Sequence, residues 1–446
     1  MKFISNSNDL SQHLGIPIIK NIPLNSISID TRTLKKHALF IAIKGKNLDG
    51  NDFVDKALKK GASIALVDDK KFLNSKNKRI VYVRNTILSL KKISKNIISG
   101  YEGNVIAITG SNGKTTTTNI LGSSLKASSK TLKNYNNEIG MPLSIMHASI
   151  KSKNLVLEIG ASKPNDINYL SKIIKPDIGV ITNIGSSHLE VLRNIEGVLK
   201  VKSELIPNIK KNGYLVVPSE NKKHLNFWKK IRSDINFVTF GMKNDADFYP
   251  RKLKHHKDGM SFSIASPYLK KDLDIITSLE GEHNVKNILA SFAVNFSIGN
   301  NNDFFAAAFK NDAIKNIRQS KSKWLKGSLL IDDTYNANPD SSKKSIDLLS
   351  NYKKRTVLVL GDMLELGKYE KKMHKEIGNY AKSKKIDLLI GFGKLTKYSV
   401  DAYGKKGVFF DDEKDLKSFL KENICSSDVI LIKGSRGMRM ERFINV

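Results

Sequence analysis

Short apolar runs alternate with longer amphipathic segments along almost the whole chain of 446 residues. Near the start, candidate strands lie at residues 38–43, 62–67 and 79–83, and a helix-like segment at 51–58 lies between the first two. A regular alternation of strand-length and helix-length segments is typical of α/β layers with largely parallel sheets. The pattern therefore predicts an α/β fold.

The remaining candidate strands form two further series. The central series comprises 105–109, 154–159, 177–182, 213–217 and 236–240, and it is followed by an apolar helix at 285–293. The last series comprises 328–332, 356–360, 387–390, 408–410 and 428–432. Because a chain of this length exceeds what one hydrophobic core supports, we predict three domains. They are a small α/β domain at 1–84, a central parallel-sheet domain at 85–312 and a C-terminal α/β domain at 313–446.

The chain is strongly basic, with a formal net charge of +32. Such a charge invites a nucleic-acid or membrane-surface function. The lysines are spread over the whole sequence, however, and no arginine-rich arm or aromatic-interleaved strip occurs. We therefore interpret the charge as a solvated basic surface that also favours polyphosphate ligands, and we expect no specific nucleic-acid partner.

Cysteine usage and hydropathy indicate the compartment. Cys425 is the single cysteine, so an internal disulfide framework is excluded. No apolar run approaches the roughly 20 residues of a membrane span, and no signal-peptide pattern follows the polar start. We expect a soluble cytoplasmic protein without a membrane span, and a monomer.

A glycine- and hydroxyl-rich loop follows the first strand of the central series. It comprises Gly110, Ser111, Asn112, Gly113, Lys114, Thr115 and Thr116. A loop between a buried strand and a helix start offers unpaired N–H groups to anions. The generic phosphate-loop pattern would need glycine at position 108, where this chain has Ile108, so a plain tight turn is the alternative. We favour nucleotide binding, with Lys114 reaching the β and γ phosphates.

Two further polar residues lie at or after the ends of later strands. Glu158 ends one strand, and His188 follows another. Ligands gather at the carboxyl ends of the strands in open α/β sheets. A lone carboxylate or histidine there is usually structural, but two beside a phosphate loop indicate magnesium ligands.

Several motifs together resemble the Mur ligases, a family that uses ATP to build the peptide of peptidoglycan. The resemblance lies in residues 109–116, 135–142, 157–161, 182–190 and 281–287. The family's phosphate loop has the shorter form found here. The resemblance implies a UDP-substrate-binding N-terminal domain, a central domain like those of P-loop ATPases and a Rossmann-like C-terminal domain.

Other segments narrow the resemblance to one branch of the family. Residues 332–341, 360–367 and 433–441 resemble the branch that adds D-alanyl-D-alanine to UDP-N-acetylmuramoyl-tripeptide, and 30–32, 38–45 and 49–50 fit its UDP-binding domain. Ligases that add the third amino acid, or glutamate to folate, are the enzymatic alternatives. A non-enzymatic P-loop or nucleic-acid-binding protein is the alternative of another class.

The resemblance also implies metal and catalytic roles. Thr115 and Glu158 would hold the Mg²⁺ of ATP, His188 would serve a second Mg²⁺, and Lys114 would clamp the phosphates. Lys202 matches the position of a lysine that is modified by CO₂ to a carbamate in the family, and Lys200 is the alternative candidate for this modification. An unmodified ammonium, with a reference pKa of about 10.4, would repel Mg²⁺.

The remaining roles concern nucleotide and substrates. Asn284 would contact the adenine side unless it only caps a helix, and Asp333 would bind ribose. Arg436 would meet a substrate carboxylate, or form a salt bridge at a helix start. The other implied contacts are Asn336 and Asn338 for closure over ATP, Thr31 and Arg32 for the uridine diphosphate, and Asn136, Asn137 and Glu138 for the muramoyl peptide. The segment 318–324 lacks the family's usual glycine-arginine pair, so Arg318 receives no role.

Overall fold

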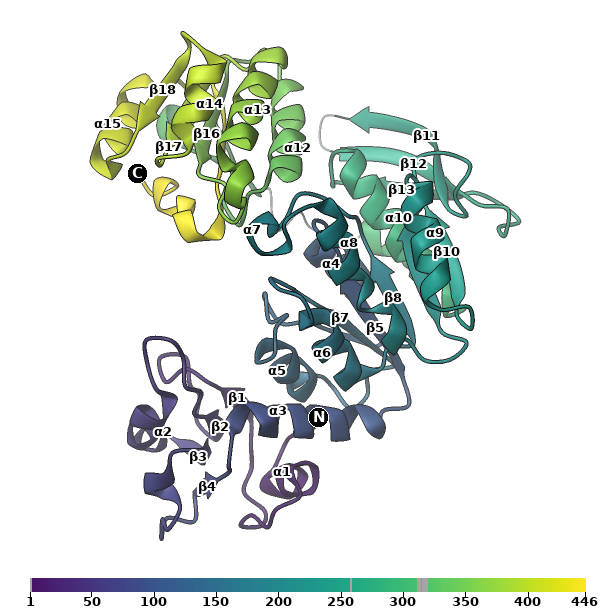
Figure 1. The fold of residues 1–446 in the computed structure, drawn as a ribbon, viewed down its shortest axis with the longest axis vertical. Helices are drawn as coiled ribbons and strands as arrows, with labels where there is room; N and C mark the ends of the chain where they lie inside the picture. Colours follow the sequence, from purple (N-terminus) through teal and green to yellow (C-terminus); the bar gives the residue numbers. More distant parts are fainter. Residues whose placement is uncertain (1, 257–258, 311–313, 315–319) are drawn as a thin grey trace.

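The computed structural model describes residues 2–256, 259–310, 314 and 320–446, arranged as three sheet-based parts (Figure 1). The α/β prediction with largely parallel sheets is confirmed. The boundary at 312/313 and Arg318 lie outside the described residues, and the predicted domain boundaries stay predictions. No helix in these described stretches has the length and apolarity to cross a membrane.

The N-terminal sheet has four parallel strands in the order β1-β2-β3-β4. Its strands are β1 Ser26–Ser28, β2 Ala38–Ile41, β3 Ala62–Val67 and β4 Ile80–Tyr82, and its helices are α1 Ser7–Leu14 and α2 Val54–Lys59. The two inner strands are buried along their whole length, which explains their continuous apolar sequence.

Helix α3 (Thr86–Ser99) joins the N-terminal part to the central part. It begins where the Asn85 side chain accepts a hydrogen bond from the N–H of Leu88. Its apolar face packs against α1 on one side and against α5 (Gly140–His147) and α6 (Asp166–Ile174) on the other. One hydrophobic core therefore runs from the N-terminal helix α1 into the central part.

The central sheet has six parallel strands in the order β10-β9-β8-β5-β7-β6. They are β5 Asn104–Thr109, β6 Ser128–Lys130, β7 Asn154–Glu158, β8 Ile178–Ile181, β9 Tyr214–Pro218 and β10 Asn236–Phe240. The remaining helices of this part are α4 Lys114–Ser124, α7 Leu189–Leu192, α8 Ile195–Ser203, α9 Lys222–Ile231, α10 Glu282–Ser297 and α11 Asn302–Lys310. Because later strands add on both sides of β5, its carboxyl end is a topological switch point. The segments after β5, β7 and β8 are brought together there.

A three-stranded antiparallel sheet follows β10, and the sequence analysis did not anticipate it. Its strands are β11 Tyr249–His256, β12 Gly259–Ala265 and β13 Leu273–Thr277. Most β11 side chains are exposed and polar, so β11 lacks an apolar alternation. Apolar residues of β12 share a buried cluster with α10, which holds this sheet on the central part.

The C-terminal sheet has the order β14-β15-β19-β16-β17-β18, with only the β14–β15 pair antiparallel among its described strands. Its strands are β14 Ser320–Lys323, β15 Leu329–Asp333, β16 Thr356–Gly361, β17 Leu388–Phe392, β18 Gly407–Phe410 and β19 Val429–Lys433. Its helices are α12 Pro339–Ser350, α13 Glu370–Ser383, α14 Thr396–Tyr403 and α15 Glu413–Asn423. Parallel pairing of β15 with β19 places Asp333 opposite Lys433.

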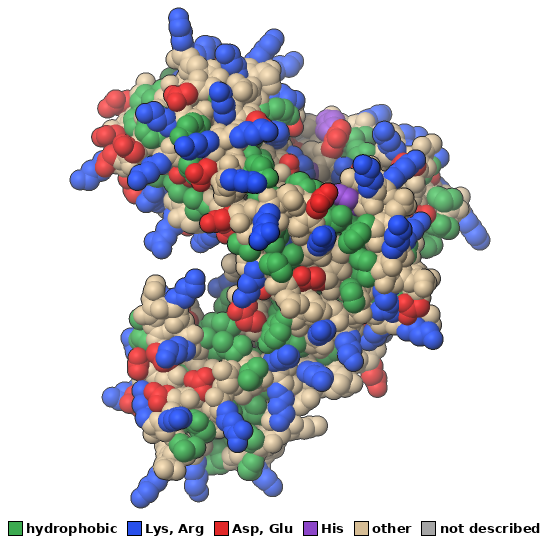
Figure 2. Space-filling view, in the orientation of Figure 1, with side chains coloured by type: hydrophobic (Ala, Val, Ile, Leu, Met, Phe, Trp, Pro, Cys, Tyr) green, Lys and Arg blue, Asp and Glu red, His purple; other side chains and the backbone are tan. Residues whose placement is uncertain are grey.

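The surface charge is dispersed. Figure 2 shows Lys and Arg side chains scattered over all three parts on the face drawn, with Asp and Glu side chains between them. This face carries no single basic strip of the kind that a nucleic-acid groove presents.

Candidate active site

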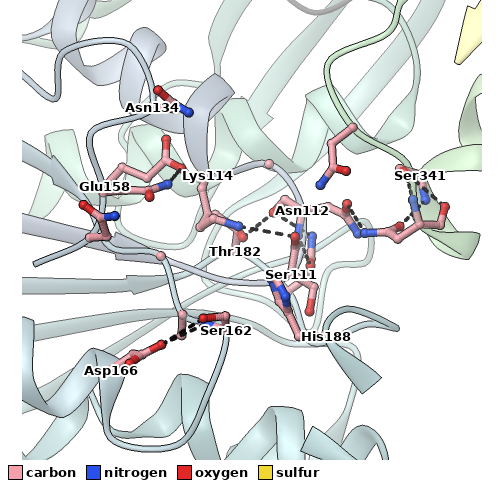
Figure 3. Close-up of a pocket in the computed structure, with 18 of the residues that line it drawn as sticks. Ser111, Asn112, Lys114, Asn134, Glu158, Ser162, Asp166, Thr182, His188 and Ser341 are labelled. Carbon is pink, nitrogen blue, oxygen red and sulfur yellow. Dashed lines mark hydrogen bonds between the residues drawn. The ribbon is translucent and has the colours of Figure 1, made fainter. Parts of the chain in front are cut away.

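A cavity of ≈ 1110 Å³ lies between the central and C-terminal parts. Its wall includes the loop after β5, the segments that follow β7 and β8, the start of α10, and residues of the C-terminal part from Asp333 to Ser345 (Figure 3). It continues along the 134–138 loop and α6 as far as Lys91 on α3. The cavity thus joins the predicted nucleotide loop to the loop predicted to face the peptide.

The loop after β5 depends on its two glycines. Gly110 has φ 140° and Gly113 has φ 83°, values that side chains rarely allow. A Cβ atom at Gly110 would collide with Oγ1 of Thr182, and one at Gly113 would collide with Oδ1 of Asn287. The Lys114 ammonium donates to the Gly110 carbonyl at 2.9 Å. The loop is therefore tightly curled at the start of α4, in the manner of a phosphate-binding loop.

Residues after β8 hold this loop in place. The N–H of Asn112 donates to Oδ1 of Asn183 at 2.9 Å, and the N–H of Ser111 donates to the Asn183 carbonyl at 3.1 Å. The Ser111 hydroxyl donates to the carbonyl of Gly185 at 2.9 Å. Asn183 and Gly185 received no role in the sequence analysis, although the motif 182–190 contains both.

An oxygen-rich cluster forms where β7 ends beside α4. Glu158 is 2% exposed, and its Oε2 accepts a hydrogen bond from the Thr115 hydroxyl at 2.7 Å. Its Oε1 accepts one from the Asn136 amide at 2.8 Å. The predicted convergence of Thr115 and Glu158 is present, and Asn136 joins them.

This cluster has the donor set that suits Mg²⁺. Hydroxyl and carboxylate oxygens are hard ligands, and Mg²⁺ in nucleotide sites is bound by one or two protein groups, phosphates and waters. Within the described parts of the chain, no three His, Cys, Asp or Glu side chains converge on one point. A closed all-protein metal cage is thus absent from these residues, whereas an open site fits Thr115 and Glu158.

His188 lies at the contact between the central and C-terminal parts and also lines the cavity. It adopts a left-handed backbone conformation with φ 52°. Its Nδ1 lies 2.6 Å from Oε2 of Glu365, in the segment after β16, and this contact lowers the pKa of Glu365. Glu365 was missed as an individual residue, because nothing in the sequence shows that a segment 177 positions later meets His188.

Lys202 lies in the last turn of α8 and is 1% exposed. Burial, and then the positive charge of Lys114, lower the pKa of Lys202 from 10.5 to about 7. The rival Lys200 is exposed. Lys202 is therefore the buried lysine of the pair and lies within electrostatic range of the phosphate loop, although it does not line the cavity.

The C-terminal part contributes an ion pair and a bridge. The Lys433 ammonium lies 2.7 Å from Oδ2 of Asp333, and it donates to the Asn336 carbonyl at 3.0 Å. The Asn338 amide donates to Oδ1 of Asn112 at 2.9 Å, a hydrogen bond that connects the two parts across the cavity. Asn338 also caps α12. Lys433, which pairs with Asp333, was not among the predicted site residues.

Arg436 lines the cavity with an exposed side chain. Its guanidinium lies 3.1 Å from the Glu441 carboxylate, and the backbone N–H of Arg436 donates to Oδ1 of Asn336 at 3.2 Å. The local salt bridge that was the structural alternative is therefore present.

The start of α10 forms another wall of the cavity. Asn284 is buried, its amide donates to the Glu280 carbonyl at 2.8 Å, and its Oδ1 accepts from Asn287 at 3.1 Å. Burial, followed by the charges of Lys344 and Lys433, lowers the pKa of the neighbouring His283 to about 3. His283 therefore contributes a neutral imidazole to this wall at physiological pH.

Thr31 and Arg32 do not line the cavity. The Thr31 carbonyl accepts a hydrogen bond from Lys60 at 3.0 Å. The Arg32 side chain is 85% exposed and lies 2.7 Å from Asp30. Their assignment to the uridine diphosphate stays a prediction.

Comparison with known proteins assigns the family. The Mur ligase middle domain matches residues 108–295, the Mur ligase glutamate ligase domain matches 318–436, and the Mur ligase family catalytic domain matches 23–97. The chain belongs to the Mur ligase family. These matches cover the phosphate loop, the cavity walls and the N-terminal sheet.

Individual Mur ligases resemble the chain over nearly its full length. The UDP-N-acetylmuramoyl-tripeptide–D-alanyl-D-alanine ligase of Bacillus subtilis is 33% identical over 97% of this chain and 94% of its own. The ligase of the same name from Haemophilus influenzae is 32% identical over 98% and 96%. The structure of MurF from Thermotoga maritima in complex with ADP superimposes with a TM-score of 0.80 at 29% identity, covering 96% of this chain and 98% of that one.

Proposed function

We propose that this Mur ligase uses ATP to join D-alanyl-D-alanine to UDP-N-acetylmuramoyl-tripeptide, giving a pentapeptide precursor of peptidoglycan. The observation that carries the proposal is one cavity in which a phosphate loop, a carboxylate–hydroxyl pair and the C-terminal part meet. Relatives of about one-third identity over nearly the whole chain bear the name of this activity.

The reaction needs an activated carboxyl group. A carboxylate is a poor electrophile because its charge repels nucleophiles and its leaving group would be oxide. A carboxylate oxygen of the tripeptide attacks the γ-phosphorus of ATP, releasing ADP and forming an acyl phosphate. The amine of D-alanyl-D-alanine then attacks the carbonyl carbon, phosphate leaves with that carboxylate oxygen, and the amine loses a proton. The protein acts by positioning and by charge stabilisation.

The phosphate loop performs the positioning. The N–H groups of Ser111 and Asn112 hold the loop to Asn183, the loop from Gly110 to Thr116 would surround the phosphates at the start of α4, and the Lys114 ammonium would neutralise the β and γ oxygens. Thr115 and Glu158 would hold Mg²⁺, which supplies further charge neutralisation. His188 would serve a second Mg²⁺ that orients the acceptor carboxylate, and its contact with Glu365 holds the imidazole ring.

We further propose that Lys202 is carbamylated. Its neutral amine would attack CO₂, form an N–C bond and lose one proton, giving a carboxylate-like group beside the loop. Burial and the lowered pKa of about 7 favour the neutral amine that this step needs. Intact-mass and ¹³C NMR measurements on protein kept with ¹³CO₂ test the assignment. An unmodified Lys202, together with full activity of Lys202→Ala, would refute it.

The C-terminal part closes the site over the nucleotide. Asp333 would contact the ribose, Asn284 the adenine side, and Asn336 and Asn338 would hold the closed arrangement, with Arg436 at a substrate carboxylate. Closure excludes water, which would otherwise hydrolyse the acyl phosphate.

The substrates would extend from the cavity toward the N-terminal part. Thr31 and Arg32 would bind the uridine diphosphate, and Asn136, Asn137 and Glu138 would face the muramoyl peptide. The hydrogen bond from Asn136 to Glu158 supports this placement, because it ties the peptide loop to the phosphate loop. We also propose that the protein is a cytoplasmic monomer.

An oxygen-18 experiment tests the acyl phosphate directly. The tripeptide is labelled with ¹⁸O in both oxygens of its terminal carboxylate and turned over with ATP and D-alanyl-D-alanine. The mechanism requires one ¹⁸O atom in each phosphate released, whereas unlabelled phosphate would overturn it.

The variant Glu158→Gln keeps the shape of the side chain but removes its charge, and we expect it to lower kcat about 100-fold or more.

A further inference from the structure

The part of the cavity beside α3 and α6 contains two opposite charges near one aromatic ring. The Lys91 ammonium, from α3, lies 4.4 Å from the ring centroid of Tyr169 on α6. Lys91, Tyr169 and Glu138 all line the cavity. In Figure 1, α3 runs along the edge of the central part that is nearest the N-terminal part, away from the C-terminal part.

Glu138 lies close enough to Tyr169 to influence it. Burial, and then the charge of Glu138, raise the pKa of Tyr169. No ion pair joins Lys91 to Glu138 or to any other residue in the described ranges. The cavity thus holds a cation over the Tyr169 ring and an anion within electrostatic range of it, without an ion pair between the two, which is an arrangement that recognises a zwitterionic group.

Further positive charges beside Lys91 make this part of the cavity favourable for a bound anion. Lys163 and Lys172 line the same region, both with exposed side chains. The other acidic residue of this wall, Asp166, is engaged in its own loop, because its Oδ2 accepts hydrogen bonds from Ser162 and from the N–H of Lys163 (Figure 3). A ligand carboxylate would find uncommitted cations in this region.

The proposed function places the third residue of the tripeptide along this wall. Its α-carboxyl group must reach the phosphate loop, and Asn136 and Glu138 belong to one loop that contacts Glu158 there. Its side chain then extends along the cavity, toward α6 and α3. A lysine side chain ends in an ammonium alone, whereas a diaminopimelate side chain ends in an ammonium and a carboxylate.

We propose that Lys91 binds the carboxylate, and Glu138 the ammonium, of a zwitterionic side chain, so that the enzyme selects a tripeptide whose third residue is a diaminopimelate-type diamino acid over one that ends in lysine. This inference rests on the proposed function. Tyr169 provides the apolar surface against which the methylene chain of that residue packs.

The test compares kcat/KM for UDP-N-acetylmuramoyl-tripeptides that end in diaminopimelate or in lysine. The native enzyme prefers the diaminopimelate substrate at least about fivefold, the effect of one partly exposed charge pair. Lys91→Met brings the ratio close to one by raising KM for the diaminopimelate substrate alone, and Lys91→Arg retains the preference. Glu138→Gln raises KM for both substrates, because both carry the ammonium.

Lys92→Met is the matched control, since Lys92 is the next residue of α3, has the same charge and does not line the cavity. It keeps the native ratio, and equal melting temperatures of the Lys91→Met and Lys92→Met variants show that both fold. Equal or better use of the lysine substrate by the native enzyme overturns this inference alone, as does a native ratio in Lys91→Met. If neither tripeptide causes ADP release, the proposed function is overturned, and this inference with it.

Discussion

The ion pair between Asp333 and Lys433 allows a sharp prediction about the C-terminal part. Both side chains are nearly buried, with 8% and 3% exposure, and the two groups lie 2.7 Å apart. Asp333 also accepts a hydrogen bond from Ser345 at 2.6 Å. Asp333→Ala therefore leaves the Lys433 ammonium buried with the Asn336 carbonyl but without its counter-charge.

The expected cost follows from this burial. Removing one partner of a buried pair typically destabilises a protein by about 3–5 kcal/mol, because the other charge stays desolvated. Replacing both partners with apolar residues is often nearly neutral. Asp333→Ala should thus lower the free energy of unfolding of the C-terminal part by about 3–5 kcal/mol, and Asp333→Leu with Lys433→Met should recover most of that loss.

Calorimetry of the intact chain measures this effect as a shift of the transition in which the Asp333–Lys433 pair is lost. For a unit of this size, Asp333→Ala should lower its Tm by about 10 °C or more. Glu376→Ala, which breaks the half-exposed pair with Lys343 in the same part, should change Tm by less than about 2 °C. A Tm for Asp333→Ala within 2 °C of the control would refute the reasoning.

Three further predictions concern the phosphate loop and its neighbours. Gly113→Ala should raise KM for ATP about tenfold or more, because the methyl group collides with Asn287 at a left-handed φ; native KM would contradict this. Asn338→Ala removes one hydrogen bond between the two parts and should raise KM for ATP about fivefold, measured by ADP release, and no change would count against closure through this contact. Lys202 has its pKa lowered to about 7, so the unfolded chain binds more protons between about pH 7 and 10.5 and native stability rises with pH there. In CO₂-free buffer the Tm advantage of Lys202→Met over the native protein should therefore shrink as pH rises from 7, and a constant difference would show that Lys202 is not desolvated.

Much of the site could be predicted because it depends on strand ends. Glu158 and the phosphate loop follow neighbouring parallel strands, and a sheet aligns such ends whatever the details of packing. The bond between Thr115 and Glu158 is the local result. Sequence register favoured Lys202 over Lys200, and burial gives an independent distinction, because Lys202 is buried and Lys200 is exposed.

The contacts that sequence reasoning missed are those between parts of the chain that are far apart. The pairs His188 with Glu365 and Asn112 with Asn338 depend on how the C-terminal part packs on the central part, and no local pattern encodes that packing. The antiparallel sheet at 249–277 was missed for another reason. Its edge strand β11 carries mostly exposed charged side chains, which protect an edge but hide the strand signal.

The formation of the amide product with matched ADP release tests the proposed activity most directly. The purified protein is incubated with ATP, UDP-N-acetylmuramoyl-tripeptide and D-alanyl-D-alanine, and product mass and ADP are measured together. We expect one pentapeptide product for each ADP, and neither product nor ADP when D-alanine alone replaces the dipeptide. ADP release without a new amide, or a product formed only with a single amino acid, would contradict the proposal.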